Sequence, residues 1–358
     1  MALTFDNNPF FGSGLDGLGA TPISTDVAAV ENLLRLCPAA AATPLHDKAA
    51  DAARMGLGSL HVKDERERMR MGSFKALGAA FVIAREAEAA RRKAGDDLAW
   101  ETALKGRVFL TASAGNHGLS VVAGARIFGA SSVIYLSETV PASFAERLRG
   151  MGAEVVIEGA DYEASMAAAE AGAVARGATL LSDSTWPGHD GGVGVMQGYL
   201  VSAREAADSC PQPPTHIFLQ AGVGGFAAAM AVHLRAAFGA APRIIVVEPD
   251  RAPALRQAIS QGQLCDAGEG VSSMGRLDCK RASLTALASL SETATDFATL
   301  TDADVEAELP QMAAMGLATS PSGGAGLAAA MIGGRSGMFG LGADSHVLVF
   351  LSEGPIGD

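Results

Sequence analysis

The feature that most constrains the fold of this 358-residue chain is an alternation of short apolar runs with alanine-rich segments, which begins near residue 107. Each run has about the length of a buried parallel strand. Such an alternation is typical of parallel βα units, in which helices cover both faces of a sheet. The predicted strands are 107–112, 132–136, 154–158, 179–183, 216–220, 243–248 and 346–351.

The predicted helices alternate with these strands, and glycines mark where several of them end. Gly129, Gly177 and Gly239 stand where a glycine commonly closes a helix. The chain exceeds the usual length of one domain, so we expect an α/β protein with two lobes. The expected helices are 119–128, 143–150, 162–176, 195–207 and 226–238.

Charge and cysteine content exclude several classes of partner. The formal charge of -12 and the pI near 5.1 leave no basic field for a nucleic acid. The apolar runs are too short to span a bilayer and the first residues lack a targeting pattern, so we expect a cytoplasmic protein without a membrane partner. The four cysteines form no CxxC pair and have no clustered histidines nearby, so we expect neither a metal site nor a disulfide framework.

Chemistry-bearing residues gather where strands end and helices begin, which is where parallel α/β sheets bind ligands. Lys75 stands between small and apolar residues at the start of an apolar helix over 76–84. Burial and a helix N-terminus both lower the pKa of an amine, and this favours a Schiff base with an aldehyde cofactor. The alternative is a solvated lysine in the first turn of a surface helix.

The segment 113–118 (SAGNHG) directly follows a predicted strand and opens a helix. Its backbone N–H groups can bind a carboxylate, and the Asn116 amide can hydrogen-bond a phenolic oxygen. The alternative is an ordinary turn in which Asn116 caps the helix. We expect His117 to be a packing or positioning residue rather than a ligand.

The segment 220–226 (QAGVGGF) offers successive backbone donors and a helix N-terminus, which suit a phosphate monoester. A dinucleotide-binding turn would have the spacing G-x-G-x-x-G in the first βα unit, whereas this turn comes late and its third spacing differs. Glu248 ends the next strand at a suitable distance, so a nicotinamide-dependent oxidoreductase stays open as an alternative.

Two further polar residues follow predicted strands. Asp183 could act as a proton-transfer base, and Ser352 could hydrogen-bond a pyridine nitrogen. Both residue types also favour plain turns, and that alternative stays open. Residues 262–290 lack a clear period, and we expect a loop plus a helix near the mouth of the site.

Together these segments resemble the tryptophan-synthase-β type, or fold type II, of pyridoxal-phosphate (PLP) enzymes across nearly the whole chain. Within that group the chain is similar to the diaminopropionate ammonia-lyase family. Eight runs in order carry this likeness: NPFF (8–11), TPL (43–45), VKDE (62–65), FKALG (74–78), DSTW (183–186), MQGY (196–199), LQAGVG (219–224) and VEPD (247–250).

The resemblance implies an architecture and a cofactor. Each of two lobes would be a mostly parallel sheet covered by helices, with 1–78 and 185–358 as the large cofactor-binding domain and 79–184 as a small inserted α/β domain. The protein would be a homodimer and would hold PLP as a Schiff base on Lys75. The cofactor's 3′-oxygen, ring nitrogen and phosphate would be bound by Asn116, by Ser352 and by Gly222, Val223, Gly224 and Gly225, respectively. The substrate would lie on Ser113, Ala114, Gly115 and His117.

The implied reaction is an α,β-elimination on a small amino acid, 2,3-diaminopropionate, which gives pyruvate and ammonia through aminoacrylate. Lys75 and Asp183 are the two candidate bases. A hydroxyl partner such as Ser352 leaves the pyridine nitrogen unprotonated, unlike an aspartate, and this favours elimination over transamination.

One position departs from the family pattern. The family usually has an aspartate before the Gly-Asn-His of this loop, whereas this chain has Ala114. A carboxylate there would attract a second ammonium group. A serine, threonine or hydroxyaspartate dehydratase or racemase of the same fold therefore stays an alternative. The basic stretch 66–70 either favours an anionic substituent or forms a solvated face. A non-catalytic PLP-binding or metabolite-binding protein is the alternative of a different class.

Overall fold

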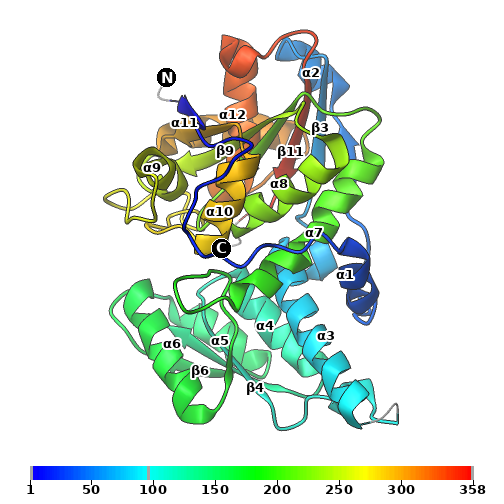
Figure 1. The fold of residues 1–358 in the computed structure, drawn as a ribbon, viewed down its shortest axis with the longest axis vertical. Coiled ribbons are helices and arrows are strands. Elements are labelled where there is room, and N and C mark those ends of the chain that lie inside the picture. Colours follow the sequence, from blue (N-terminus) through cyan, green and yellow to red (C-terminus); the bar gives the residue numbers. More distant parts are fainter. Residues whose placement is uncertain (1–2, 95–96, 356–358) are drawn as a thin grey trace.

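The computed structural model describes residues 3–94 and 97–355, which form two sheets (Figure 1). The strand orders are β1-β10-β9-β8-β11-β3-β2 in the large sheet and β6-β5-β4-β7 in the small sheet. Neighbouring strands are parallel except at the two edges of the large sheet, where β1 and β2 run antiparallel to β10 and β3. The strands are β1 (Thr4–Asn7), β2 (Leu45–Asp47), β3 (Ser59–Asp64), β4 (Val108–Ala112), β5 (Ser131–Leu136), β6 (Glu154–Ile157), β7 (Thr179–Leu180), β8 (His216–Gln220), β9 (Arg243–Pro249), β10 (Asp296–Leu300) and β11 (His346–Leu351).

Six of the seven predicted strands are confirmed within a residue or two at each end, and the two-lobed α/β class is confirmed with them. The prediction for 179–183 was too long, because β7 ends at Leu180 and Asp183 lies in the following loop. Four strands were not predicted. Two of these, β1 and β2, are short edge strands, and β3 carries Lys63 and Asp64 among its buried residues.

Helices cover both sheets, and the five predicted ones are confirmed. The helix expected over 76–84 is longer and begins at Lys75 itself. The helices are α1 (Val27–Leu34), α2 (Ala49–Arg54), α3 (Lys75–Ala94), α4 (Asn116–Ile127), α5 (Ala142–Gly150), α6 (Tyr162–Arg176), α7 (Gly192–Ser209), α8 (Gly225–Phe238), α9 (Ala254–Gln261), α10 (Leu284–Thr293), α11 (Asp302–Ala314) and α12 (Pro321–Ser336), with 3₁₀ turns η1 (Arg68–Arg70), η2 (Trp100–Thr102) and η3 (Met338–Gly340).

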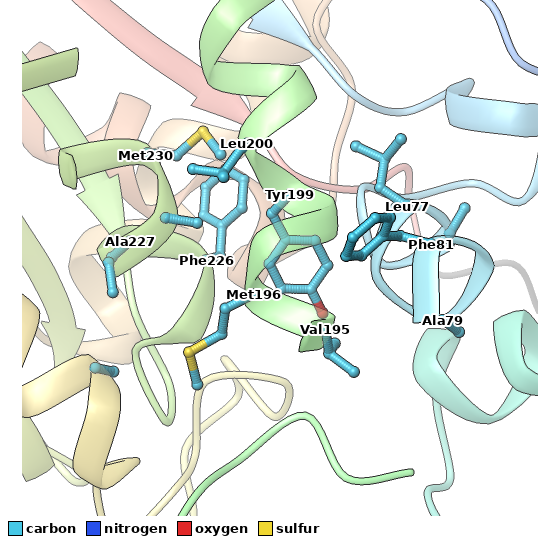
Figure 2. Packing of buried hydrophobic residues seen from close by; sticks show 14 of the residues in the cluster. Leu77, Ala79, Phe81, Val195, Met196, Tyr199, Leu200, Phe226, Ala227 and Met230 are labelled. Carbon is cyan, nitrogen blue, oxygen red and sulfur yellow. The ribbon is translucent and has the colours of Figure 1, made fainter. Parts of the chain in front are cut away.

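Helix α7 joins the two halves of the molecule, because it packs against α3 on one side and against α8 on the other (Figure 1). Glycines allow the close crossing with α3. A Cβ placed on Gly198 would lie 2.6 Å from the carbonyl oxygen of Leu77, and a Cβ placed on Gly78 would lie 2.6 Å from the Val195 side chain. Figure 2 shows the resulting core, in which Tyr199 of α7 lies between α3 and Phe226 of α8. The start of α3 is thereby fixed against the start of α8.

The strands of the small sheet lie within residues 108–180, and those of the large sheet within 4–64 and 216–351. The expected domain boundaries, at 78/79 and 184/185, fall between the two sets of strands and stay a prediction. Among the described residues, no helix combines the length and the apolar character that a membrane crossing needs.

Candidate active site

Lys75 and Asp183 form a hydrogen-bonded pair at the start of α3. The Lys75 Nζ donates to Asp183 Oδ2 at 2.5 Å, and the two side chains are 24% and 15% exposed. Burial lowers the pKa of Lys75, but Asp183, with smaller contributions from Cys279 and Glu353, raises it, and the net shift is upward. The expected depression of the Lys75 pKa is therefore wrong, because sequence reasoning did not include this partner. Burial raises the pKa of Asp183, and the Lys75 ammonium and His117 lower it well below its usual range.

The glycine loop 222–225 lies beside this pair. A Cβ placed on Gly225 would be 3.4 Å from the Asp183 carbonyl oxygen, and the rings of Phe74 and Phe226, which adjoin Lys75 and Gly225 in the chain, have centroids 4.3 Å apart. The backbone N–H groups that could bind a phosphate therefore lie close to Lys75.

The loop has a backbone that only glycine accommodates. Gly224 has φ +94°, and a Cβ on it would lie 2.9 Å from Leu255. A Cβ on Gly222 would lie 3.1 Å from both the Arg276 carbonyl oxygen and the Cys279 Sγ. A loop with three glycines in four residues at the N-terminus of α8 presents backbone donors and a helix dipole, so it fits a phosphate monoester.

Asn116 is directed at a carboxylate from the far end of the chain. The cap of α4 is Gly115, and the Asn116 Nδ2 donates to Glu353 Oε2 at 2.8 Å, so the interpretation of Asn116 as a capping residue is wrong. Ser352 is buried, and its carbonyl oxygen accepts the N–H of Phe74, the residue before Lys75, at 3.1 Å. The turn that follows β11, with Ser352 and Glu353, is therefore hydrogen-bonded both to the residue before Lys75 and to the asparagine loop.

The remaining residues of the asparagine loop surround this contact. The Ser113 Oγ accepts the Gly115 N–H at 3.2 Å, and Ala114 is exposed. His117 is buried, with Nε2 donating to the Leu181 carbonyl oxygen at 2.8 Å. Burial lowers the pKa of His117, and Lys75 lowers it further against the opposing effect of Asp183. A buried imidazole that is held through Nε2 and has a lowered pKa suits a positioning residue.

Three residues at the site were missed by sequence reasoning. Glu353 follows Ser352 directly, so its place after a buried strand was an available signal. Arg276 and Cys279 come from the loop 262–283, which has no periodicity to point to them; burial raises the pKa of Cys279 to about 11, which keeps it a thiol. Within the described residues, no group of three His, Cys, Asp or Glu side chains is arranged to hold a metal ion.

The basic stretch 66–70 does not form a solvated face as a whole. Arg66 pairs with Asp64 at 2.6 Å, and Arg68 is buried against Glu65 and Glu205. These ion pairs correct the interpretation of the whole stretch as a solvated face, and a preference for an anionic substituent stays a prediction.

Comparisons with known proteins agree on the family. Residues 36–353 match the pyridoxal-phosphate dependent enzyme family. The diaminopropionate ammonia-lyase of Salmonella typhimurium is 31% identical over 355 residues, which cover 88% of this chain and 86% of that protein. The diaminopropionate ammonia-lyase of Escherichia coli, solved in complex with an aminoacrylate–PLP azomethine reaction intermediate, has a TM-score of 0.86 at 24% identity and covers 99% of this chain and 94% of its own. Maize serine racemase has a TM-score of 0.77 at 21% identity, and the match covers 93% of this chain and 94% of the racemase chain.

The two structural matches confirm the two-lobed fold type II architecture. The family match and the relative from Salmonella typhimurium confirm PLP as the cofactor and an enzyme as the class of protein. The lysine, the glycine cradle and the asparagine loop described above fit that cofactor. The chain belongs to the pyridoxal-phosphate dependent enzymes and, among them, to the diaminopropionate ammonia-lyase family.

Proposed function

We propose that this chain catalyses α,β-elimination of ammonia from 2,3-diaminopropionate, so that substrate and water give pyruvate and ammonia through aminoacrylate. The observation that carries the proposal is the Lys75–Asp183 pair beside the glycine loop, with Asn116 and Ser352 close to it. The name of the relative from Salmonella typhimurium and the intermediate in the Escherichia coli structure support this reaction.

Each binding residue has a role that its place supports. Lys75 would hold the cofactor's aldehyde, and the backbone of Gly222, Val223, Gly224 and Gly225 its phosphate. Asn116 would donate to its 3′-oxygen, and the Ser352 hydroxyl would face the ring nitrogen. When bound, PLP withdraws electrons from the substrate's α-carbon and makes the α-proton acidic.

Lys75 and Asp183 would move the protons. Their 2.5 Å contact brings Nζ and the carboxylate within proton-transfer distance of each other, so either group could serve as the base beside the substrate's α-carbon. The loop of Ser113, Ala114, Gly115 and His117 would bind the substrate carboxylate through its backbone N–H groups. Burial of the pair strengthens the electrostatic interaction between its two charges.

We also propose that the protein is a cytoplasmic homodimer with the domain division expected above. The support is the family resemblance and, for the domains, the separation of the two sheets. A small amino acid would be its only partner besides a second copy of the chain.

One observation favours a second candidate function. Ala114 is exposed in the asparagine loop and supplies no carboxylate for a second ammonium group. A dehydratase or racemase of hydroxy amino acids would need no such carboxylate.

The test is an absorbance spectrum of the purified protein with PLP, followed by pyruvate-release assays on L- and D-diaminopropionate, serine and threo-hydroxyaspartate. The proposal expects a visible band of lysine-bound cofactor and keto-acid release from diaminopropionate. Release from hydroxy amino acids alone would favour the second candidate, and a band without any turnover would make the chain a non-catalytic binding protein.

A further inference from the structure

Arg276 occupies a place between two ligand-binding loops that none of the expected roles uses. Its N–H donates to Ser322 Oγ at 3.1 Å, at the first turn of α12. Its carbonyl oxygen would lie 3.1 Å from a Cβ on Gly222, and its Nε 3.8 Å from a Cβ on Gly115. The residue is therefore in contact range of both the phosphate loop and the asparagine loop.

The guanidinium of Arg276 is held from one side. Nη1 donates to Glu353 Oε1 at 2.8 Å, and the same oxygen accepts a hydrogen bond from Ser320 Oγ. The other carboxylate oxygen, Oε2, accepts a hydrogen bond from the Asn116 Nδ2. Glu353 is nearly fully buried, so this carboxylate is a fixed anchor rather than a surface counter-ion. It orients Arg276 and Asn116 together.

The other side of the guanidinium remains available. An arginine has five N–H donors in a planar fork, and in the described part of the chain Nε and Nη2 have no hydrogen-bond partner. The side chain is 34% exposed, so these donors reach open space next to Gly115. Ala114 places no charge there to compete for them.

We propose that Arg276 binds a carboxylate of the substrate, with Glu353 as its positioning residue. A carboxylate matches the arginine fork in geometry and charge. A carboxylate held by the N–H groups of the asparagine loop would lie beside Gly115, within reach of the free donors. The nature of the substrate rests on the proposed function, whereas the anion site is a property of the chain itself.

The carboxylate has two sources, which predict different kinetics. If it is the α-carboxylate, Arg276→Gln raises KM for diaminopropionate, serine and hydroxyaspartate by a common factor of about 10 or more, with kcat changed less. If it is a second carboxylate, only KM for hydroxyaspartate rises.

Malonate binding to the PLP-loaded enzyme, followed by calorimetry, tests the same site without turnover. Arg276→Gln is expected to weaken malonate binding about 10-fold or more, and Arg276→Lys, which keeps the charge but loses the fork, by a smaller factor. Arg281→Gln is the matched control, since Arg281 lies on the same loop, pairs with Asp266 and is half exposed. It should leave malonate binding and KM unchanged.

The outcomes separate this inference from the proposed function. Wild-type enzyme that binds malonate through Arg276 but releases no keto acid would overturn the proposed reaction and keep the anion site. Unchanged malonate affinity and unchanged KM values in folded, PLP-loaded Arg276→Gln would overturn the anion site. If that variant does not fold, Arg276→Lys decides: malonate affinity equal to wild type overturns the proposal, and weaker binding supports it.

Discussion

Two groups of charged side chains, both close to the chain segment 63–75, differ in how completely they are paired. The closed cluster of Lys63, Glu65, Arg68 and Glu205 has salt bridges of 2.6 Å from Lys63 to Glu205 and from Arg68 to both acids. The open cluster of Lys75, Asp183, Asn116, Glu353 and Arg276 is partly exposed and keeps free donors. Ion pairs of similar length can therefore have different roles. Those in the closed cluster stabilise the fold, whereas the open cluster has N–H donors that are still available to bind a ligand.

The closed cluster explains how the chain reaches Lys75. It ties β3, η1 and α7 together, with Thr43 and Ser202 satisfying further atoms of its acids and of Arg68. Directly after Arg68, Met69 and Arg70 have φ of 50° and 60°, a region that costs side-chain-bearing residues energy. The ion pairs of the closed cluster stabilise this unfavourable backbone conformation. The segment then leads to Lys75, the first residue of α3.

The largest expected effect is that of Lys75→Ala in the open cluster. Loss of the amine would remove the proposed covalent anchor of the cofactor and one of two candidate bases, so turnover and the visible absorbance band should both be abolished. Spectra, pyruvate release and circular dichroism on the same preparation check this. A folded variant that kept the band and the activity would refute the assignment of Lys75.

Asp183→Asn should have the next largest effect. The amide keeps the shape but cannot accept a proton as a base, so we expect kcat to fall by about 10²- to 10⁴-fold with the visible band retained. Because Asp183 raises the pKa of the Lys75 amine, that amine should titrate at lower pH in the cofactor-free variant than in the cofactor-free wild type. A kinetic isotope effect with α-deuterated substrate would show whether α-proton removal has slowed. Unchanged turnover with every substrate would make Asp183 a structural acid.

The sequence predicted one of these clusters in part and the other not at all. Lys75, Asn116 and Asp183 stand next to glycines or strand ends, and such local patterns were enough to select them. Glu353 and Arg276 act through tertiary contacts: Asn116 and Glu353 are 237 residues apart. For the same reason β3 was missed, since its charged residues are buried against partners that the local sequence does not reveal: Glu205 on α7 for Lys63, and Arg66 and His46 for Asp64.

Arg68→Met tests the closed cluster. In contrast to Lys75→Ala, it should lower the stability of the fold and leave the activity largely intact. Removing the cation leaves the fully buried Glu65 without its closest charged partner and Glu205 with Lys63 alone, which costs about 3–5 kcal/mol of unfolding free energy. Activity per folded molecule should stay close to that of wild type. Urea unfolding and keto-acid release check the two halves of this prediction.

The control for that variant is Arg204→Ala on the surface of α7, where Arg204 pairs with Asp208 one turn on. An exposed pair of this kind contributes at most about 1 kcal/mol. Equal losses of stability in the two variants would show that the closed cluster is no more structural than a surface pair.

The last prediction concerns Glu248, a buried carboxylate that belongs to neither cluster. It is fully buried and accepts the N–H groups of Leu255 and Arg256 at 2.7 and 2.8 Å, at the start of α9. Burial raises its pKa from 4.5 to about 8, against the lowering effect of those two N–H groups. The folded protein therefore holds this proton more tightly than the unfolded chain does, and the stability that it contributes below pH 4.5 is lost as pH rises through about 8.

Glu248→Gln removes this titration, so the difference in unfolding free energy between wild type and variant should change by up to about 1.4 kcal/mol per pH unit inside that window and level off above it. The variant should gain relative to wild type as pH rises, because the glutamine has no charge to bury. Urea unfolding at several pH values between about 5 and 9 measures the difference directly. A constant difference across the range would mean that the two backbone donors compensate the Glu248 charge as fully as the cations of the closed cluster compensate Glu65.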